Sequence, residues 1–433
     1  MRLQTERIYF TAEKWFVVAA LLYFLGAIIP VLRNPGHVSS EVQASDPFAL
    51  LLQVLIYGTA LIFMIPTAGR LLRALARNPV LAGFLLLILM SSLWSAAPLF
   101  TLRRAMWFML TSVFGLYFGT RFDIREQIRL LASALAVCIA LSIFFIVALP
   151  RYGYDLLLYK DAWRGVFFHK NALGCYMVVA VITFLCFKAE TVAELVGKYL
   201  CLVLSVGLLI GSEAKGAYVV LLVSILLMFL YRLLHLYWKR LIPAATIALV
   251  LIAVGAAYVA SNADAILQVL GKNATLTGRI PLWTDVLAIS THNRWFGYGF
   301  AGFWATNSHS VWSMVGWMPH ESHNGFIDIL LELGAVGLAI FALNTAIAFW
   351  RGVKLVARER TLESQWPLLM LSVILLYNMF ESNLMVQNGF LWVAYVAMTV
   401  SAQRAWDVSM ATEPMDAPPD VQLSALEYES CPQ

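Results

Sequence analysis

The stretch His320-Glu321-Ser322-His323-Asn324-Gly325-Phe326 stands directly before a long apolar run, Phe326–Trp350. A helix needs about 20 apolar residues to cross the hydrocarbon core of a bilayer. The apolar run is long enough, so we expect a membrane span with ring-bearing and charged side chains at its mouth. Polar groups held at such a position are where we expect the chemistry of the protein.

The composition of the whole chain agrees with this first expectation. Hydrophobic residues make up 61% and charged residues 13% of the sequence, and the mean hydropathy is +0.77. These values lie outside the usual balance of soluble domains. The apolar runs lack the period-2 alternation of a lipid-facing barrel. They predict an all-α polytopic membrane protein with about twelve transmembrane helices. The predicted spans are Trp15–Leu32, Phe48–Ile65, Val80–Ala97, Ala105–Thr120, Leu130–Leu149, Ala172–Phe187, Tyr199–Ile210, Ala217–Leu234, Leu241–Ala260, Phe326–Trp350, Leu368–Phe380 and Phe390–Ala402.

Orientation follows from the lysines and arginines, most of which fall on the inner side if both termini are cytoplasmic. This topology leaves two large outer loops, 150–171 and 261–325, the second containing short surface helices. It divides the chain into a five-span region (1–149), a second membrane region (150–405) and a disordered cytoplasmic tail (406–433). No cysteine lies in an outer loop, so no disulfide framework is expected.

The first outer loop brings several hydrogen-bond donors to the membrane surface. Arg164, His169, Lys170 and Asn171 lead straight into a span, where a lipid-linked diphosphate would lie. The alternative is that the cations only anchor the loop at the interface, within an aromatic belt.

A charged turn, Gly211–Gly216, separates two later spans. Charge is costly at the centre of a span, so Glu213 and Lys215 must lie at the surface or in a polar cavity. They either pair with each other, or Lys215 faces the same cavity as Arg164.

The second outer loop contains a helix start. Thr277 is a plausible cap, and Arg279 would lie near the helix N-terminus, where free backbone amides favour anions. The apolar stripe of this helix predicts that it lies along the membrane surface, and its members are Leu282, Val286, Leu287 and Ile289.

His320 and His323 allow two interpretations. With Glu321 they could bind zinc, but the pattern lacks a third well-spaced ligand. Alternatively, one of them is a general base that neighbouring cations keep neutral. Glu381 follows a later span and is either part of the same cavity or an ordinary helix-end carboxylate. We predict neither a metal nor another cofactor.

Taken together, the motifs resemble one known family. They are Arg164-Gly165, His169-Lys170-Asn171 with Gly174, Thr277-Gly278-Arg279 with Trp283, and His323-Asn324 with Asp328, Glu332, Gly334, Gly337 and Leu338. In this order and on one side of the membrane they look like the O-antigen ligase and polysaccharide polymerase superfamily. The arrangement is most similar to the exopolysaccharide-polymerase-like branch.

The resemblance implies an activity. It implies metal-independent, inverting glycosyl transfer at the periplasmic face of a bacterial inner membrane, from a glycan on undecaprenyl diphosphate to an acceptor sugar hydroxyl. The acceptor is a lipid-linked repeat unit in a polymerase and a lipid A core sugar in a ligase, and polymerisation of exopolysaccharide or O-antigen units is our first expectation. The expected partners are the lipid-linked donor, a glycan or lipid acceptor, the bilayer and other polysaccharide assembly proteins, without nucleic acid. A polysaccharide or lipid transporter and a non-catalytic scaffold remain as alternatives.

The resemblance also implies roles for single residues. His323 matches the catalytic histidine, and Arg164 and Arg279 match two arginines that face the donor diphosphate, so all three are expected to be catalytic. The expected diphosphate ligands are Arg164, Lys170, Lys215 and Arg279, and the expected supporting residues are His169, Asn171, His320, Asn324 and Glu381. Lys215 stands where relatives often have arginine, and His320 leaves the choice of base open.

Overall fold

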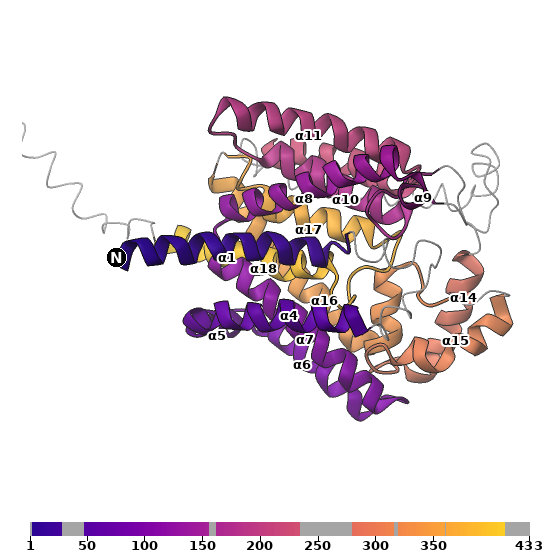
Figure 1. The fold of residues 1–433 in the computed structure, drawn as a ribbon. Coiled ribbons are helices and arrows are strands. Elements are labelled where there is room, and N and C mark those ends of the chain that lie inside the picture. Colours follow the sequence, from indigo (N-terminus) through magenta and orange to yellow (C-terminus); the bar gives the residue numbers. More distant parts are fainter. Residues whose placement is uncertain are drawn as a thin grey trace, which may run out of the picture.

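The protein is almost entirely helical in the part of the chain that the structure describes. A computed structural model describes residues 2–27, 47–155, 162–233, 279–315, 319–359 and 361–411. These residues contain no strand, and a single antiparallel bridge joins Tyr154 to Trp163. The all-α prediction is therefore confirmed for these residues (Figure 1).

The helices follow the predicted spans closely. They are α1 (Arg2–Phe24), α4 (Pro47–Met64), η1 (Ile65–Thr67), α5 (Ala68–Ala76), α6 (Pro79–Met90), η2 (Ser91–Leu93), α7 (Pro98–Arg121), α8 (Ile124–Ala148), α9 (Pro150–Gly153), α10 (Lys170–Cys186), α11 (Val192–Gly211), the helix Lys215–Leu233, α14 (Arg279–Ser290), η3 (Thr291–Asn293), α15 (Gly302–Val315), α16 (Gly325–Arg358), α17 (Trp366–Tyr377) and α18 (Phe390–Ala411). Every predicted span falls at least partly on one of these helices except Leu241–Ala260, which lies outside the described residues.

Length and apolar composition allow 5 of the described helices to cross a membrane. They are Pro47–Ala76, Ile124–Ala148, Val192–Gly211, Lys215–Leu233 and Gly325–Arg358. Shorter apolar helices are Pro79–Leu93, Lys170–Cys186 and Trp366–Tyr377. The chain is thus a multi-pass membrane protein, while the count of about twelve spans stays a prediction.

The centre of the bundle is the pair α7 and α18, which lie unusually close together. A Cβ atom on Gly115 would come within 2.9 Å of the Val393 carbonyl oxygen, and one on Gly119 within 2.7 Å of the Ala397 carbonyl oxygen. Small residues four apart let two membrane helices approach in this way. The Gly115–Gly119 spacing therefore sets the packing of α7 against α18.

Helix α16 is broken in its first half by a glycine. Gly334 has φ 68°, a left-handed conformation that other residues rarely adopt. The segment 294–299 fills the break: the Gly299 amide donates to the Glu332 carbonyl at 2.9 Å, and the Ala335 amide donates to the Arg294 carbonyl at 2.8 Å. The second outer loop is thereby tied into the helix that follows the His323 loop.

Helices α14 and α15 pack together at one end of the bundle (Figure 1). Leu282 and Val286 of α14 are fully buried against Phe303, Val311 and Leu331. These buried positions belong to the predicted apolar stripe, whereas Leu287 of the same stripe is 38% exposed. Part of the stripe therefore builds a small protein core and does not face lipid.

Helices α16 and α18 extend to the opposite end of the bundle. Helix α16 begins beside His323 and continues to Arg358, while α18 begins at Phe390 and continues to Ala411. Helix α18 therefore continues past residue 406, where the tail was predicted to begin. Residues 412–433 lie outside the described part of the chain.

Candidate active site

The loop that carries His323 is held by hydrogen bonds to its own backbone and to α16. Asn324 is the N-cap of α16, and its side-chain oxygen accepts from the Phe326 and Ile327 amides at 3.0 and 3.3 Å. Such caps satisfy amides that have no partner within the helix. The Ser322 hydroxyl donates to the Asn324 carbonyl at 2.8 Å, and the Trp283 indole donates to the Ser322 carbonyl at 2.8 Å.

The turn after α17 is fastened to this loop. The Asn324 amide donates to the Ser382 hydroxyl at 3.0 Å, and the Gly325 amide donates to the Asn378 carbonyl at 2.9 Å. A Cβ atom at Gly325 would come within 2.5 Å of the Asn378 side-chain oxygen. Glu381 lies between these anchoring points, so its carboxylate has a fixed place beside the His323 loop.

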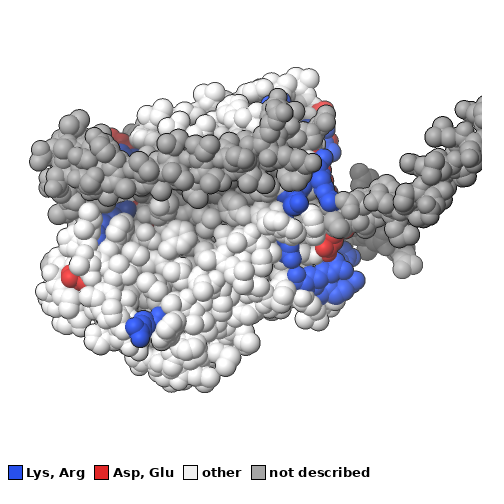
Figure 2. Space-filling view, turned by 180° about the vertical axis from the view of Figure 1, so that it is seen from behind, with Lys and Arg blue, Asp and Glu red and all other residues white. Residues whose placement is uncertain are grey.

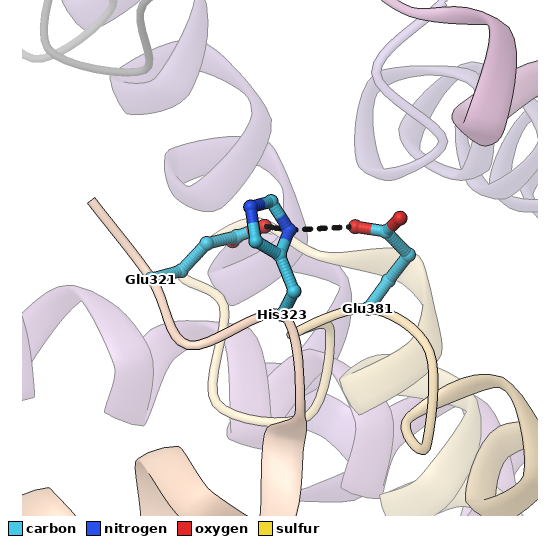
Figure 3. A group of neighbouring side chains, drawn as sticks. All are labelled: Glu321, His323 and Glu381. Atoms are coloured by element: carbon cyan, nitrogen blue, oxygen red, sulfur yellow. Dashed lines mark hydrogen bonds and ion pairs between the residues drawn. The ribbon is translucent and has the colours of Figure 1, made fainter. Parts of the chain in front are cut away.

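Glu381 joins three distant segments of the chain. Its Oε1 atom accepts from Asn171 Nδ2 at 2.8 Å and from Arg279 Nη2 at 3.0 Å. Its Oε2 atom lies 3.2 Å from His323 Nδ1 (Figure 3). Arg279 also donates through Nη1 to the Phe380 carbonyl at 2.6 Å. One carboxylate thus brings together residues of both outer loops that the sequence motifs singled out.

His323 is bordered by two carboxylates. Its Nδ1 atom lies 3.1 Å from Glu321 Oε1 as well as 3.2 Å from Glu381 Oε2. The other ring nitrogen points away from both carboxylates (Figure 3). The backbone of His323 has φ 54°, in the left-handed region that non-glycine residues rarely adopt and that is enriched at functional sites.

The electrostatic environment of His323 corrects one expectation. Burial lowers the pKa of His323, but its contacts with Glu321 and Glu381 and their charges outweigh burial and raise the pKa to about 9. The expectation that neighbouring cations keep this imidazole neutral is wrong, because its direct charged contacts are carboxylates. Isolated from substrate, the ring is held in its protonated form at neutral pH.

Glu381 stays ionised despite its location. Its side chain is 14% exposed. Burial would raise its pKa, but the contact and charge of His323 and the charges of Arg279 and His169 hold the pKa below the ordinary value. A permanent negative charge therefore lies between a histidine and an arginine.

The first outer loop approaches the same cluster through His169. His169 caps α10, with Nδ1 accepting from the Asn171 amide at 3.2 Å, and its Nε2 lies 3.9 Å from Asp155 Oδ2. Burial lowers the pKa of His169 against the opposing charges of Asp155 and Glu381. Asp155 also acts electrostatically on Arg164, which is buried and donates through Nε to the Tyr152 carbonyl at 3.0 Å. Arg164 is therefore connected to the His323 cluster through Asp155 and His169.

The two predicted lysines lie at the edge of this group. Lys170 is within electrostatic range of Glu213, Asp155 and Lys215. Lys215 itself is exposed at the start of the helix Lys215–Leu233. The lysines thus neighbour the first outer loop.

Two predicted residues have roles other than a direct place in the cluster. His320 is exposed, and within the described residues the close group of titratable side chains consists of Glu321, His323 and Glu381. Asn324 is committed to capping α16. Thr277, the expected cap of α14, lies outside the described residues, and α14 is described from Arg279 onward.

Residues 200–342 match the model of a family described as O-antigen ligase. The chain is also 27% identical over 306 residues to the exopolysaccharide production protein ExoQ of Rhizobium meliloti (strain 1021), an alignment that covers 63% of this chain and 64% of that protein. The chain thus spans a little less than two thirds of the length of this relative. The resemblance to the O-antigen ligase and polysaccharide polymerase superfamily is confirmed. The family match includes Arg279 and His323, whereas Arg164 and Glu381 lie outside it and are linked to the site by the contacts above.

Several residues of the site were not predicted from the sequence. No role was predicted for Asp155, and no spacing pattern links it to His169. Tyr377 donates through its hydroxyl to the Asn171 carbonyl at 2.5 Å, although its position in an apolar run predicted only a core residue. Glu321 was considered as a zinc ligand, and its adjacency to the histidines was the signal available for a charge partner.

The arrangement has two chemical capacities. A histidine whose Nδ1 faces a carboxylate can take a proton through its other nitrogen, as bases oriented by a third group do. Arginines beside it can stabilise a developing phosphate charge. Glu321, His323 and Glu381 also offer ligand atoms within 4.8 Å of one another, which fits a divalent cation.

Proposed function

We propose that this protein is a glycosyltransferase of the O-antigen ligase and polysaccharide polymerase type. It transfers a glycan from undecaprenyl diphosphate to an acceptor sugar hydroxyl, with inversion, at the periplasmic face of the inner membrane. The observation that carries the proposal is the junction at Glu381, where one carboxylate contacts both His323 and Arg279. His323 Nδ1 lies 3.2 Å and Arg279 Nη2 lies 3.0 Å from an oxygen of the Glu381 carboxylate. A base and a cation placed in this way suit a reaction in which a hydroxyl attacks and a diphosphate leaves.

His323 acts as the base in this proposal. Glu381 orients the ring through Nδ1, so in the neutral form of the ring, which predominates above its pKa of about 9, the nitrogen on the far side accepts the proton of the acceptor hydroxyl. The oxygen of that hydroxyl then bonds to the anomeric carbon while the bond from that carbon to the diphosphate oxygen breaks. Glu381 stabilises the imidazolium that forms, which is the usual role of a carboxylate behind a catalytic histidine.

Arg279 and Arg164 bind the leaving diphosphate. Guanidinium groups match phosphate oxygens with paired donors, and Lys170 and Lys215 add positive charge at the edge of the site. Arg279 is 25% exposed at its side chain and so retains surface for a ligand while bound to Glu381. The donor would approach along the first outer loop, where Asp155 lies beside His169 and acts electrostatically on Arg164.

The test exploits the two neighbouring histidines. His323→Ala should abolish transfer in purified protein supplied with a lipid-linked repeat unit, a loss of about 10²–10⁴-fold for a general base. His320→Ala is the matched control and should retain activity, because His320 is exposed and lies outside the close group. Long glycan from the His323 variant would contradict the proposal. Substrate flux into proteoliposomes without any glycosidic product would favour the transporter alternative.

Polymerase is the first candidate, and ligase is the second. The relative named for exopolysaccharide production favours a polymerase, and the family described as O-antigen ligase favours a ligase. Incubation with the lipid-linked repeat unit alone should give polymer if the first is right. Product that forms only after addition of lipid A core would identify a ligase.

We also propose that the reaction needs no metal ion. In the proposed site the guanidinium of Arg279 already places a positive charge on Glu381. Chelation should therefore leave transfer unchanged. Activity that is lost with a chelator and restored by a divalent cation would assign Glu321, His323 and Glu381 to metal binding instead.

A further inference from the structure

Two adjoining pockets lie at the end of the bundle opposite the candidate active site. Their volumes are about 450 and about 230 Å³. The charged side chains that line them are Arg70, Arg73, Arg77, Arg351, Arg404 and Asp407. We call this group the arginine pocket. In Figure 2 the lysines and arginines gather at that end, and the described lateral surface is almost uncharged.

The arginines come from three helices that meet at this end. Arg70, Arg73 and Arg77 follow one another at spacings of three and four, which places them on one side of α5 and its C-cap. Arg351 lies in the last part of α16, and Arg404 lies in α18. None of these residues takes part in the candidate active site, which lies at the starts of α10 and α16 and in the turn after α17.

The positive charge of the pocket is incompletely balanced. Asp407 accepts from Arg77 at 2.6 Å and from Gln403. Arg404 instead donates to the Gly119 and Phe122 carbonyls, at 2.7 and 3.2 Å.

Arg351 also has a neutral acceptor, since it donates to the Asn78 side-chain oxygen at 2.7 Å. Asp123 and Glu126 at the start of α8 act electrostatically on Arg404 from outside the lining. Among the described lining residues, a single carboxylate therefore faces five guanidinium groups.

Exposed apolar side chains lie on the same three helices as the lining arginines. Leu72 is 69% exposed, Val408 66% and Trp350 51%. Trp406 lines the pocket and contacts the Trp350 ring at 5.0 Å. A ligand in this pocket would contact guanidinium groups on one side and exposed apolar side chains on the other.

We propose that the arginine pocket binds the phosphate of an anionic phospholipid, with the acyl chains lying against the exposed apolar side chains. Guanidinium groups bind phosphate oxygens through paired hydrogen bonds. The positive-inside distribution predicts this end to be cytoplasmic, where basic residues meet anionic headgroups. The pocket is a lipid site separate from the donor site.

The test compares lipids retained by the purified full-length protein in native mass spectrometry. The protein is exchanged from detergent into mixtures of phosphatidylglycerol and phosphatidylcholine. We expect preferential retention of phosphatidylglycerol, and Arg73→Gln/Arg77→Gln should reduce it about 25-fold, at roughly fivefold for each arginine near a membrane surface. Arg103→Gln, an exposed arginine at the other end of α7, is the matched control and should retain the lipid.

Two further arms identify the source of the anion. Inorganic phosphate at millimolar concentration should fail to displace the lipid, because it lacks acyl chains. Full-length protein with Glu413→Gln, Asp416→Asn and Asp420→Asn tests the acidic tail as an occupant, and lipid retention should be unchanged. Equal retention of both lipids, an unaffected arginine variant, displacement by phosphate alone, or binding seen only after the tail is neutralised would each overturn the proposal.

Discussion

The two ends of the helical bundle hold charge in opposite ways. At the site end, Glu381 is shared by Arg279 and His323, and its side chain is only 14% exposed. At the other end, Arg77 and Asp407 pair at 2.6 Å with side chains that are 61% and 36% exposed. Buried charges need partners in fixed geometry, whereas exposed pairs contribute little and exchange readily with ligands. This difference in exposure suits the Glu381 cluster to orienting reacting groups and the arginine pocket to binding an anion from outside.

The largest difference between the two ends is expected in the rate of glycan transfer when the buried carboxylate of Glu381 is removed. Glu381→Ala should lower the rate of glycan transfer about 10²–10³-fold, because His323 loses its orienting partner and Arg279 loses its anchor. The rate is measured with purified protein and lipid-linked donor. Asp407→Asn, the equivalent loss at the arginine pocket, should leave that rate unchanged. Equal rates for wild type and Glu381→Ala would remove the junction from the mechanism.

The scaffold of the site end can be tested at the break in α16. Gly334→Ala should lower the apparent melting temperature, since a left-handed conformation costs an L-residue about 1–2 kcal/mol and the added Cβ would meet the Trp295 backbone. Gly58→Ala is the control, because nothing lies within 4 Å of a Cβ at that helical position. It should be neutral or slightly stabilising. The melting temperatures of both variants are measured in the same detergent. Similar melting temperatures would show that the packing of segment 294–299 against α16 does not require the break at Gly334.

Much of the fold could be predicted because apolar length is a local property. The run Leu130–Leu149 predicts a helix, and α8 covers nearly all of it. Helix ends depend on other signals. The predicted span Tyr199–Ile210 begins too late because Thr191 caps α11 by accepting from the Glu194 amide. The pair Thr191 and Glu194 is a sequence signature of a helix start that hydropathy alone ignores.

The candidate site could be predicted as a set of residue types but not as a set of contacts. Asn171 and Glu381 are separated by 210 residues and Arg279 and Glu381 by 102, so no periodicity relates them. Their meeting depends on how the outer loops fold over the starts of α10 and α16. The same tertiary contact explains why the expected cationic surroundings of His323 were wrong. A loop motif identifies a histidine, but its pKa depends on which charged groups the rest of the chain brings beside it.

The pH dependence of glycan transfer should respond to a carboxylate at the site end but not to one at the arginine pocket. A base must be neutral to accept a proton, so activity should rise with pH toward the raised pKa of His323, about 9. Glu381→Gln removes one of the carboxylates that raise this pKa, so the ascending limb should move to lower pH. Asp407→Asn should leave the limb in place. The profile of initial rate against pH provides the measurement, and a limb that moves to higher pH in Glu381→Gln would reverse the inferred role of the carboxylate.

The smallest effect is expected at the exposed carboxylate of the arginine pocket. Asp407→Asn removes the residue that competes with a phosphate for Arg77, so retention of phosphatidylglycerol should increase about fivefold, the ratio that corresponds to about 1 kcal/mol for one charge near a membrane surface. The gain should shrink at high salt, because exposed charges are screened over about 10 Å at 0.1 M ionic strength. Native mass spectrometry at two salt concentrations provides the readout, with Asp285→Asn in α14 at the other end of the bundle as the control for the same change in total charge. Reduced lipid retention would mean that Asp407 organises the arginines instead of competing with the ligand, and the two ends of the bundle would then hold their charges by the same principle.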